Sequence, residues 1–335
     1  MENYKVFLGS SSGRNFQESI GHCMERADNL NKTNPYHQGL IEDLEIIKTG
    51  VGNPFYCMFY LGGTYEAQAS VDLVVHGDIQ AFKQHAYVGA KLKILGQDGA
   101  HWGYYSYSTK YFTSLLSDNQ ELKEFLILNQ DMISGSLNQK HYKGNEIYPY
   151  FNRSALLALS GDWELLKERS LRFLKDETRA KSTKQLEPDF EFFMALANQD
   201  ADAMKQVLEN MLAKRLARKV GHDLNLWFDF YLCMPVLMYA KIAAIHGFDL
   251  GIDSPIAPKE LIEVKPLESY EDPYDFMKEF DYKQPQQVWI DRWKAKMKAG
   301  LAWREREQKK LKNRILRFFG RGGIDLQTSS PIDKK

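Results

Sequence analysis

Residues Ser154–Lys175 read SALLALSGDWELLKERSLRFLK, and this stretch holds the pattern that decides the fold. An apolar segment ends at Ser160-Gly161, and Asp162 then precedes a second segment whose apolar residues lie three and four positions apart. An Asp in this place accepts hydrogen bonds from the free N–H groups of a helix's first turn, and its charge suits the positive end of the helix dipole. The stretch predicts two helices joined by a tight turn.

The same pattern occurs three times in the chain. His76–Lys83 reads HGDIQAFK, Ser160–Lys167 reads SGDWELLK and Asn198–Lys205 reads NQDADAMK. Each has a large apolar residue four positions after its Asp and a Lys five positions after it. The apolar residue would face the preceding helix. Such tightly turned hairpins are typical of α-solenoids. The three Asp residues are 84 and 38 positions apart, so the pattern fits either a degenerate, TPR-like repeat or three separate helix starts in a bundle.

Helical periodicity dominates the rest of the chain, and strand alternation is nearly absent. Only Tyr4–Leu8 could form a short strand, and it has no evident pairing partner. We therefore predict an all-α fold, an irregular α-solenoid or bundle of helical hairpins. The expected helices are Phe16–Leu30, His37–Lys48, Thr64–Val75, Ile79–Leu95, Ser106–Leu116, Asn119–Asn129, Ser154–Leu159, Trp163–Lys175, Phe190–Ala197, Ala201–Arg218, Trp227–His246, Tyr274–Phe280 and Gln287–Phe319.

Charge divides the chain into an acidic body and a basic end. Residues 286–335 contain 14 basic and 5 acidic residues, so they carry +9 and residues 1–285 carry −9. We expect a helical body over residues 1–285, a long basic helix packed on it over 286–320, and a flexible tail over 321–335. A basic amphipathic helix can bind nucleic acid or an anionic membrane surface, or it can simply present a solvated face.

Composition indicates an ordinary globular protein of the cytoplasm. The 335 residues are 44% hydrophobic and 13% aromatic, and no leader with an apolar core begins the chain. The most apolar stretch, Leu224–Ile245, is interrupted by charged residues and a proline, which favours a buried core helix over a membrane span. Three widely spaced cysteines fit reduced thiols better than disulfides: Cys23, Cys57 and Cys233.

The search for reaction chemistry finds little. Gly9–Gly13 reads GSSSG and matches the Gly-x-Ser-x-Gly pattern of hydrolases, but that motif needs a parallel sheet and distant Asp and His partners. The eight histidines show neither His-Glu-x-x-His nor zinc-ligand spacing. We predict neither catalytic residues nor a metal or cofactor. An enzyme of a helical fold remains an alternative, and Ser11 would be its candidate nucleophile.

Two acidic regions are candidates for binding a partner. Between Glu268 and Asp281 there are six acids against one Lys, interleaved with aromatic residues. Such a segment could engage a basic protein surface, or it could pair with the basic helix that follows it. Acids also begin two predicted helices near residues 189 and 200. The candidate contact residues are Asp189, Glu191, Asp200, Asp202, Glu268, Tyr270, Glu271, Asp272, Tyr274 and Asp275.

Residues 229–262 read DFYLCMPVLMYAKIAAIHGFDLGIDSPIAPKELI. The apolar helix that ends in Ala-x-x-x-Gly, followed by Asp-Ser-Pro-x-x-Pro-x-Glu-Leu, resembles the immunity protein 49 family of bacterial polymorphic toxin systems. The resemblance implies an all-α protein without catalytic residues that binds a cognate toxin one-to-one. Toxins of such systems are commonly delivered by type VI secretion.

The resemblance thus favours an antitoxin that acts by occlusion. A helical-repeat scaffold for peptides of another pathway is the first alternative. The second is a nucleic-acid-binding regulator that uses the basic helix, although the acidic body would repel phosphate.

Overall fold

The computed structural model describes residues 4, 6–10, 12–99, 109–134, 147–178, 181–213 and 225–310. Over these ranges the regular structure is helical, and the only strand-like pairing is an isolated bridge between Ser254 and Ala257. The predicted all-α fold is therefore confirmed. The helices are α1 (Phe16–Ala27), η1 (Asp28–Leu30), α2 (His37–Thr49), α3 (Pro54–Val71), the π-helical turn η2 (Asp72–His76), α4 (Ile79–Leu95), α5 (Thr109–Leu116), α6 (Gln120–Leu128), α7 (Gln130–Ser134), α8 (Ile147–Ser160), α9 (Trp163–Lys175), α10 (Lys181–Lys184), α11 (Glu187–Ala197), α12 (Ala201–Leu212), α14 (Met234–Ile245), α15 (Lys259–Ile262), α16 (Asp275–Lys278) and α17 (Gln286–Lys309).

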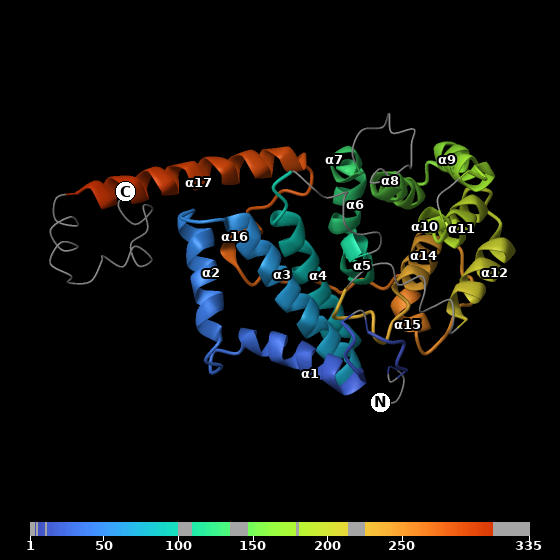
Figure 1. Ribbon diagram of the computed structural model, residues 1–335, viewed down its shortest axis with the longest axis horizontal. Helices are drawn as coiled ribbons and strands as arrows, with labels where there is room; N and C mark the ends of the chain where they lie inside the picture. The colour runs from blue at the N-terminus through green and yellow to red at the C-terminus, as the bar shows by residue number, and fades with distance from the viewer. Residues whose placement is uncertain are drawn as a thin grey trace.

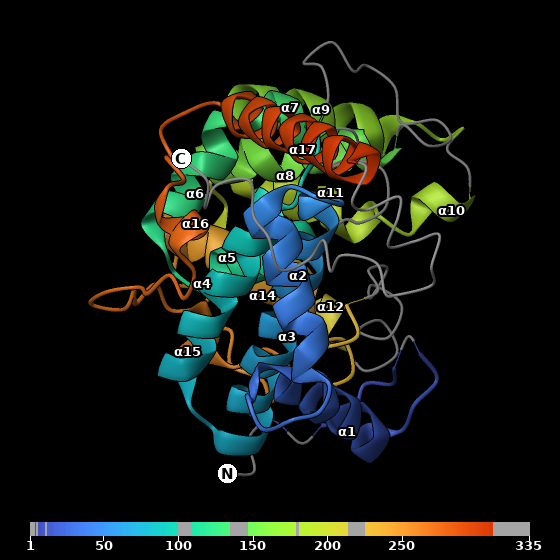
Figure 2. The same ribbon diagram turned by 90° about the vertical axis from the view of Figure 1, so that its left-hand side faces the viewer.

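The helices form two packed groups on either side of a central one (Figure 1). Helices α1 to α4 form one side, with α2 and α4 both against α3, and α8 to α12 form the other side. Helices α5, α6 and α7 lie between them, and α14, which lies with the second group in this view, packs on α5. The view in Figure 2 shows α17 crossing over this body as a separate layer. Helices α3 and α4 approach each other closely where Gly62 faces Gly89. A Cβ added to Gly62 would lie only 2.9 Å from the Gly89 carbonyl oxygen, so the absence of a side chain permits this approach.

All three predicted hairpin turns have the same geometry. Asp78, Asp162 and Asp200 are N-cap residues, and each carboxylate accepts a hydrogen bond from the backbone N–H three residues later, at 2.9, 3.3 and 2.9 Å. The residue before each Asp is left-handed, with φ of 66° at Gly77, 79° at Gly161 and 55° at Gln199. The apolar residues at plus four are fully buried, as predicted: Phe82, Leu166 and Met204.

Three predicted helix starts are wrong by seven residues or more, and the simplest case is the expected Ser154–Leu159 helix, which begins at Ile147. The expected Trp227–His246 helix begins only at Met234, because Pro235 lacks an N–H and is accommodated in a first turn and not in a helix interior. The expected Thr64–Val75 helix begins ten residues earlier, at Pro54, with Asn53 as its N-cap. Helix α3 is buried on most of its faces, so its sequence lacks the amphipathic period that marks a surface helix.

The ends of the chain also differ from prediction or lie outside the described residues. Tyr4 lies in a turn and residues 6–8 form no strand, although the Leu8 N–H donates to the Phe230 carbonyl at 2.9 Å. The predicted helical residues 106–108, 214–218 and 311–319 lie outside the described residues. In the part that is described, no helix is both long and apolar enough to cross a lipid bilayer.

Candidate functional site

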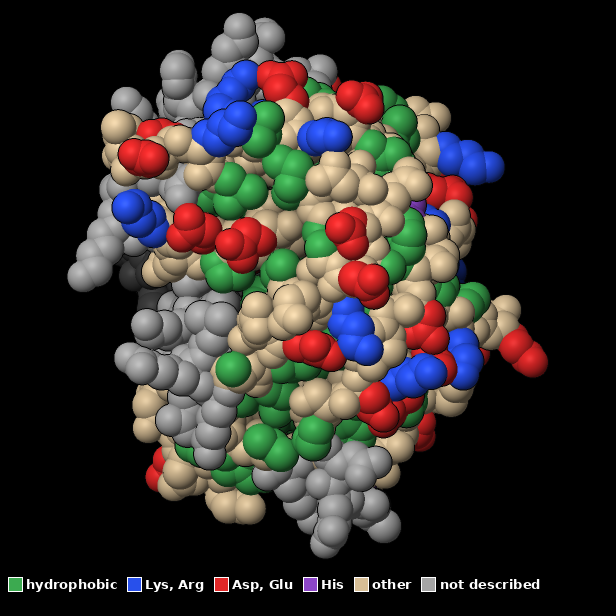
Figure 3. Space-filling model, turned by 90° about the vertical axis from the view of Figure 1, so that its right-hand side faces the viewer, with side chains coloured by type: hydrophobic (Ala, Val, Ile, Leu, Met, Phe, Trp, Pro, Cys, Tyr) green, Lys and Arg blue, Asp and Glu red, His purple; other side chains and the backbone are tan. Residues whose placement is uncertain are grey.

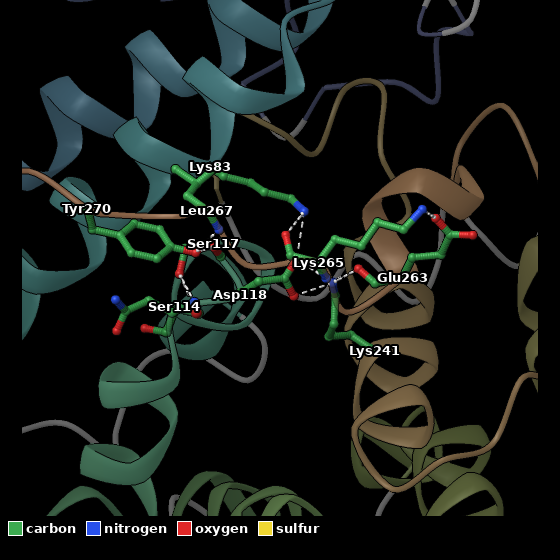
Figure 4. Close-up of polar contacts among 10 residues, drawn as sticks. Lys83, Ser114, Ser117, Asp118, Lys241, Glu263, Lys265, Leu267 and Tyr270 are labelled. Carbon is green, nitrogen blue, oxygen red and sulfur yellow. Dashed lines mark hydrogen bonds and ion pairs between the residues drawn. The ribbon is translucent and has the colours of Figure 1, made fainter.

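A buried ionic cluster lies where α4, α14 and the turn between α5 and α6 meet (Figure 4). The Asp118 carboxylate is 2.8 Å from the Lys83 ammonium and 2.6 Å from the Lys241 ammonium. The three side chains are at most 2% exposed. Asp118 has a left-handed backbone, with φ of 59°, which turns its carboxylate toward both lysines. One buried carboxylate thus compensates two buried cations.

The cluster holds residues 263–285, the segment between α15 and α17, which we call the strap. The Lys241 ammonium donates to the Glu263 carbonyl at 2.8 Å, and the Lys83 ammonium donates to the Lys265 carbonyl at 2.6 Å. The Lys265 N–H in turn donates to the Asp118 carboxylate at 3.2 Å. The two ammonium groups outnumber the one carboxylate, and each of them also donates to a strap carbonyl. These bonds fix the backbone at the start of the strap.

The chemistry of this cluster is that of a structural clamp. Burial lowers the pKa of Lys241 to about 8, a value at which a lysine could exchange protons near neutral pH. However, its ammonium already contacts Asp118 and the Glu263 carbonyl, and the adjoining cavity of about 20 Å³ holds about one water molecule. The cavity that Asp118 lines is therefore too small for a substrate.

The rest of the strap is bound along α4. Gln84 and Glu271 exchange two hydrogen bonds, at 2.8 Å from the Gln84 side-chain amide to the Glu271 carbonyl and at 3.1 Å in return. Asp272 accepts from the Lys91 ammonium at 2.7 Å and from the Tyr87 hydroxyl at 3.0 Å. Burial lowers the pKa of Lys91, and Asp272 partly offsets this. The strap is therefore a fixed surface feature, although little of it is helical.

The strap's predicted contact residues divide into exposed and internal ones. Glu268, Glu271 and Asp275 are exposed. Asp272 and the two tyrosines are half-buried and bonded within the molecule: the Tyr270 hydroxyl donates to the Ser117 carbonyl at 2.6 Å, and Tyr274 accepts from Tyr65 at 3.1 Å. The carboxylates of Glu268, Glu271 and Asp275 thus face solvent, while Asp272 and the two tyrosines fasten the strap to the body.

The sequence also allowed the acidic strap to pair with the basic helix that follows it. Among the described residues, one ion pair of this kind is present. Glu279 forms an ion pair with Arg292 of α17. Asp272 instead pairs with Lys91 of α4, and Asp275 pairs with Lys278 within the strap at 2.9 Å. In the part of the chain that the structure describes, the basic helix therefore neutralises only a small part of the strap's charge.

The four candidates on α11 and α12 lie at the opposite end of the molecule. Asp189 is 3% exposed and accepts a hydrogen bond from the Tyr239 hydroxyl, so its prediction as a surface contact is wrong. The prediction for Asp189 rests on the acids that begin this predicted helix, but α11 is packed on several sides, so an acid in its first turn can be buried. Glu191, Asp200 and Asp202 are exposed. Figure 3 shows this end of the molecule, where acidic and basic side chains are interspersed.

The predicted basic helix is present as α17 over Gln286–Lys309, and residues 311–320 lie outside the described residues. Its first turns pack on the body through Trp289, Ile290 and Trp293, all at most 5% exposed. The side chains of Gln286 and Trp289 donate to the Ile94 and Leu95 carbonyls at 2.9 and 3.2 Å, which satisfies two end groups of α4. Many basic side chains of α17 remain exposed: Arg292, Lys294, Lys298, Arg304, Arg306 and Lys309.

Sequence reasoning missed a groove between α1, α2 and α3, which we call the α1–α3 groove. It encloses about 1160 Å³ and is bordered by exposed aromatic and acidic side chains, among them Tyr36, Tyr56, Glu25 and Glu42. A repeated tyrosine at positions 56 and 60, one helical turn apart beside an acidic α2, was the available signal. Neither helix on its own reveals a groove, because the groove depends on how they pack.

The motifs considered for chemistry find no support in the described residues. Ser10 and Ser12 of the GSSSG segment share a hydrogen bond of 2.7 Å, Ser11 lies outside the described residues, and no strand is present in the described ranges to carry a hydrolase elbow. No group of three or more His, Cys, Asp or Glu side chains that could hold a metal ion occurs in the described part of the chain.

Comparison with known proteins gives one match. No curated protein and no solved structure matches the chain. Residues 80–261 match the family described as Immunity protein 49. This range is more than half of the chain, and it contains two of the three hairpin turns, those at Asp162 and Asp200, together with Lys83, Asp118 and Lys241 of the buried cluster. The chain belongs to the immunity protein 49 family.

Proposed function

We propose that this protein neutralises a cognate bacterial toxin by stoichiometric binding and that it acts without catalysis, in the cytoplasm of the cell that it protects. Membership of the immunity protein 49 family supports an immunity function in general. The finer proposal is a one-to-one complex in which the bound protein covers the toxin's working surface. A toxin of a polymorphic system delivered by type VI secretion is the expected partner.

The observation that carries this proposal is the strap. It presents Glu268, Glu271 and Asp275 to solvent while buried contacts at Asp118 and Asp272 fix its backbone. A surface that is ordered before binding loses less conformational entropy when a partner docks. Exposed carboxylates on such a surface accelerate encounter with a cationic partner.

Co-expression with the protein encoded by the neighbouring gene tests the proposal. We expect the wild-type chain to rescue growth of cells that express that neighbour and to co-purify with it at a one-to-one ratio measured by light scattering. Absence of both the rescue and the complex would contradict the proposed function.

Charge reversal then locates the contact surface. The triple variant Glu268→Lys, Glu271→Lys, Asp275→Lys should weaken the complex by about tenfold or more, because it replaces three attractive charges with repulsive ones. The double variant Glu191→Lys, Asp202→Lys changes the α11–α12 end in the same way. Loss of binding in the double variant alone would move the toxin surface to that end of the molecule.

A further inference from the structure

The α1–α3 groove is an open cavity lined by side chains of α1, α2 and α3 and of the segment between α1 and α2. Its volume of about 1160 Å³ compares with about 300 Å³ for the pocket between α14 and residues 259–265. The first turns of α2 form one wall, and the exposed edge of α3 forms the other. The space is sufficient for several side chains of a partner protein.

Exposed aromatic rings border the groove. Tyr36, Tyr56 and Tyr60 are 77%, 65% and 44% exposed. Tyr56 and Tyr60 stack with 6.3 Å between ring centroids, and the Arg26 guanidinium lies 3.4 Å above the Tyr60 ring. Exposed tyrosines of this kind are common anchors of protein interfaces because they bury a large area at a low cost in side-chain entropy. The Arg26 guanidinium thus makes a cation–π contact with this wall, which is the kind of contact that a partner's lysine or arginine would make with an exposed tyrosine.

The charge of the groove is negative. Glu25, Asp28, Glu42 and Asp43 line it, against Arg26 as the one fully charged basic residue among the lining side chains. Burial is the main cause that lowers the pKa of His22, so this histidine adds little positive charge at neutral pH. Burial also raises the pKa of the half-buried Asp43 carboxyl, so a cation that entered the groove would relieve an unfavourable charge.

We propose that the α1–α3 groove receives a basic segment of the cognate toxin, with lysine or arginine side chains set against the acidic walls and over the exposed tyrosines. This inference rests on the proposed function and adds a second contact surface to the strap. The groove is built from residues 22–64, which precede the family match at 80–261, and the strap, residues 263–285, follows that match. Both surfaces thus lie outside residues 80–261, the range that matches the family.

Gly39 provides a way to fill the groove without disturbing the fold. It lies in the first turn of α2, lines the groove, and a Cβ added to it would meet no heavy atom within 4 Å. The variant Gly39→Leu should therefore fold normally and obstruct a docked segment. Gly21 of α1 is the matched control, because an added Cβ there also meets nothing within 4 Å and Gly21 does not line the groove.

The experiment measures the affinity of each variant for the neighbouring gene's product by calorimetry, with circular dichroism as the check on folding. We expect Gly39→Leu to raise the Kd by about a hundredfold, as for a blocked interface centre. The double variant Glu25→Lys, Glu42→Lys should raise it by about tenfold. Gly21→Leu and the double variant Glu124→Lys, Glu305→Lys, which changes two exposed acids elsewhere, should bind as the wild type does.

The outcomes separate this inference from the proposed function. If the groove variants bind as tightly as the wild type, the inference is wrong and the antitoxin function stands. If the wild type itself neither binds nor neutralises the toxin, both fail together. If the control variants weaken binding as much as the groove variants, the effect is not local and the inference is also wrong.

Hydrogen exchange distinguishes other occupants of the groove. In the complex, we expect slower exchange over residues 36–46 and 54–64. If a chain that ends at Lys310 exchanges faster over residues 36–46 without any toxin, the protein's own basic end fills the groove and the inference is overturned. A free wild-type dimer that Gly39→Leu converts to a monomer would assign the groove to a second copy and overturn it equally.

Discussion

At the scale of single residues, Asp118 links three parts of the molecule that are far apart in the sequence. Its carboxylate joins α4 through Lys83, α14 through Lys241 and the strap through the Lys265 N–H. A non-glycine residue with positive φ is uncommon, and Asp and Asn tolerate that conformation best. Asp therefore suits position 118 for two reasons: it tolerates the left-handed backbone, and its carboxylate neutralises the two buried lysines.

We predict that Asp118→Asn lowers the free energy of unfolding by about 3 kcal/mol. The variant keeps the left-handed backbone and the size of the side chain, but it leaves two buried ammonium groups without a counter-charge. Urea unfolding at neutral pH measures the change. Asp78→Asn is the control, since Asn caps a helix as well as Asp does and little change is expected there. Equal effects at the two positions would contradict the role of Asp118.

The pH dependence of stability should reveal Lys241. Its pKa is about 8 in the folded protein because of burial, below the ordinary value of 10.5 that applies after unfolding. Between these pH values the unfolded chain binds the proton and the folded chain does not, so this group makes the unfolding free energy rise with pH from about 8 to about 10.5. Below pH 8 the cost of burying the charge is present in full.

The variant Lys241→Met tests this. It removes one titrating group and leaves Asp118 paired with Lys83, so we expect only a modest change in stability at pH 7. The unfolding free energy of the wild type minus that of the variant should increase between pH 8 and 10. A difference that stays constant over this range would show that Lys241 titrates normally.

At the scale of secondary-structure elements, the hairpin turn is the recurring unit. Each turn places a left-handed residue before an Asp N-cap and buries the apolar residue four positions later. Two of the turns use Gly at the left-handed position, where the absence of a Cβ removes the steric cost. The α11–α12 turn uses Gln199 instead, so this turn carries a strain that the others lack.

Gln199→Gly should therefore stabilise the protein, by about 0.5 kcal/mol. The relief of the left-handed strain exceeds the extra entropy that glycine gives to the unfolded chain. Thermal unfolding measures the gain. Gln206→Gly, at an exposed position within α12, provides the contrast, because glycine in a helix interior costs about 1 kcal/mol. A loss of stability at both positions would contradict the argument for residue 199.

At the scale of the whole molecule, charge is separated along the chain and in space. Residues 1–285 carry −9, and residues 286–335 carry +9. In the structure, α17 crosses over the body as its own layer, and it pairs with the strap through Glu279 and Arg292. In the described part of the chain, the strap acids Glu268, Glu271 and Asp275 are exposed and the α1–α3 groove is lined mainly by acids, so we expect both surfaces to attract a cationic partner.

We predict that association with the toxin depends strongly on salt. Raising the ionic strength from about 0.05 M to about 0.5 M should slow association by about tenfold, because long-range attraction is screened. Dissociation should change much less, since close contacts are screened weakly. Stopped-flow fluorescence can measure both rates. An association rate that does not vary with salt would argue against the acidic surfaces as the docking region.

The sequence by itself determined the helical fold, the three hairpin turns and the family. Capping and helical periodicity involve residues within a few positions of one another, so they can be read locally at Asp78, Asp162 and Asp200. The resemblance over residues 229–262 likewise needs only the order of residues, and the family match bears it out.

Only the tertiary structure decided which acids face solvent and which hold the interior together. Asp118 and Asp189 look like surface acids in the sequence, yet both are buried because distant helices supply Lys83, Lys241 and Tyr239 as partners. The α1–α3 groove likewise exists only once α2 packs against α3. Burial and shape depend on residues far apart in the chain, and a local pattern contains no information about them.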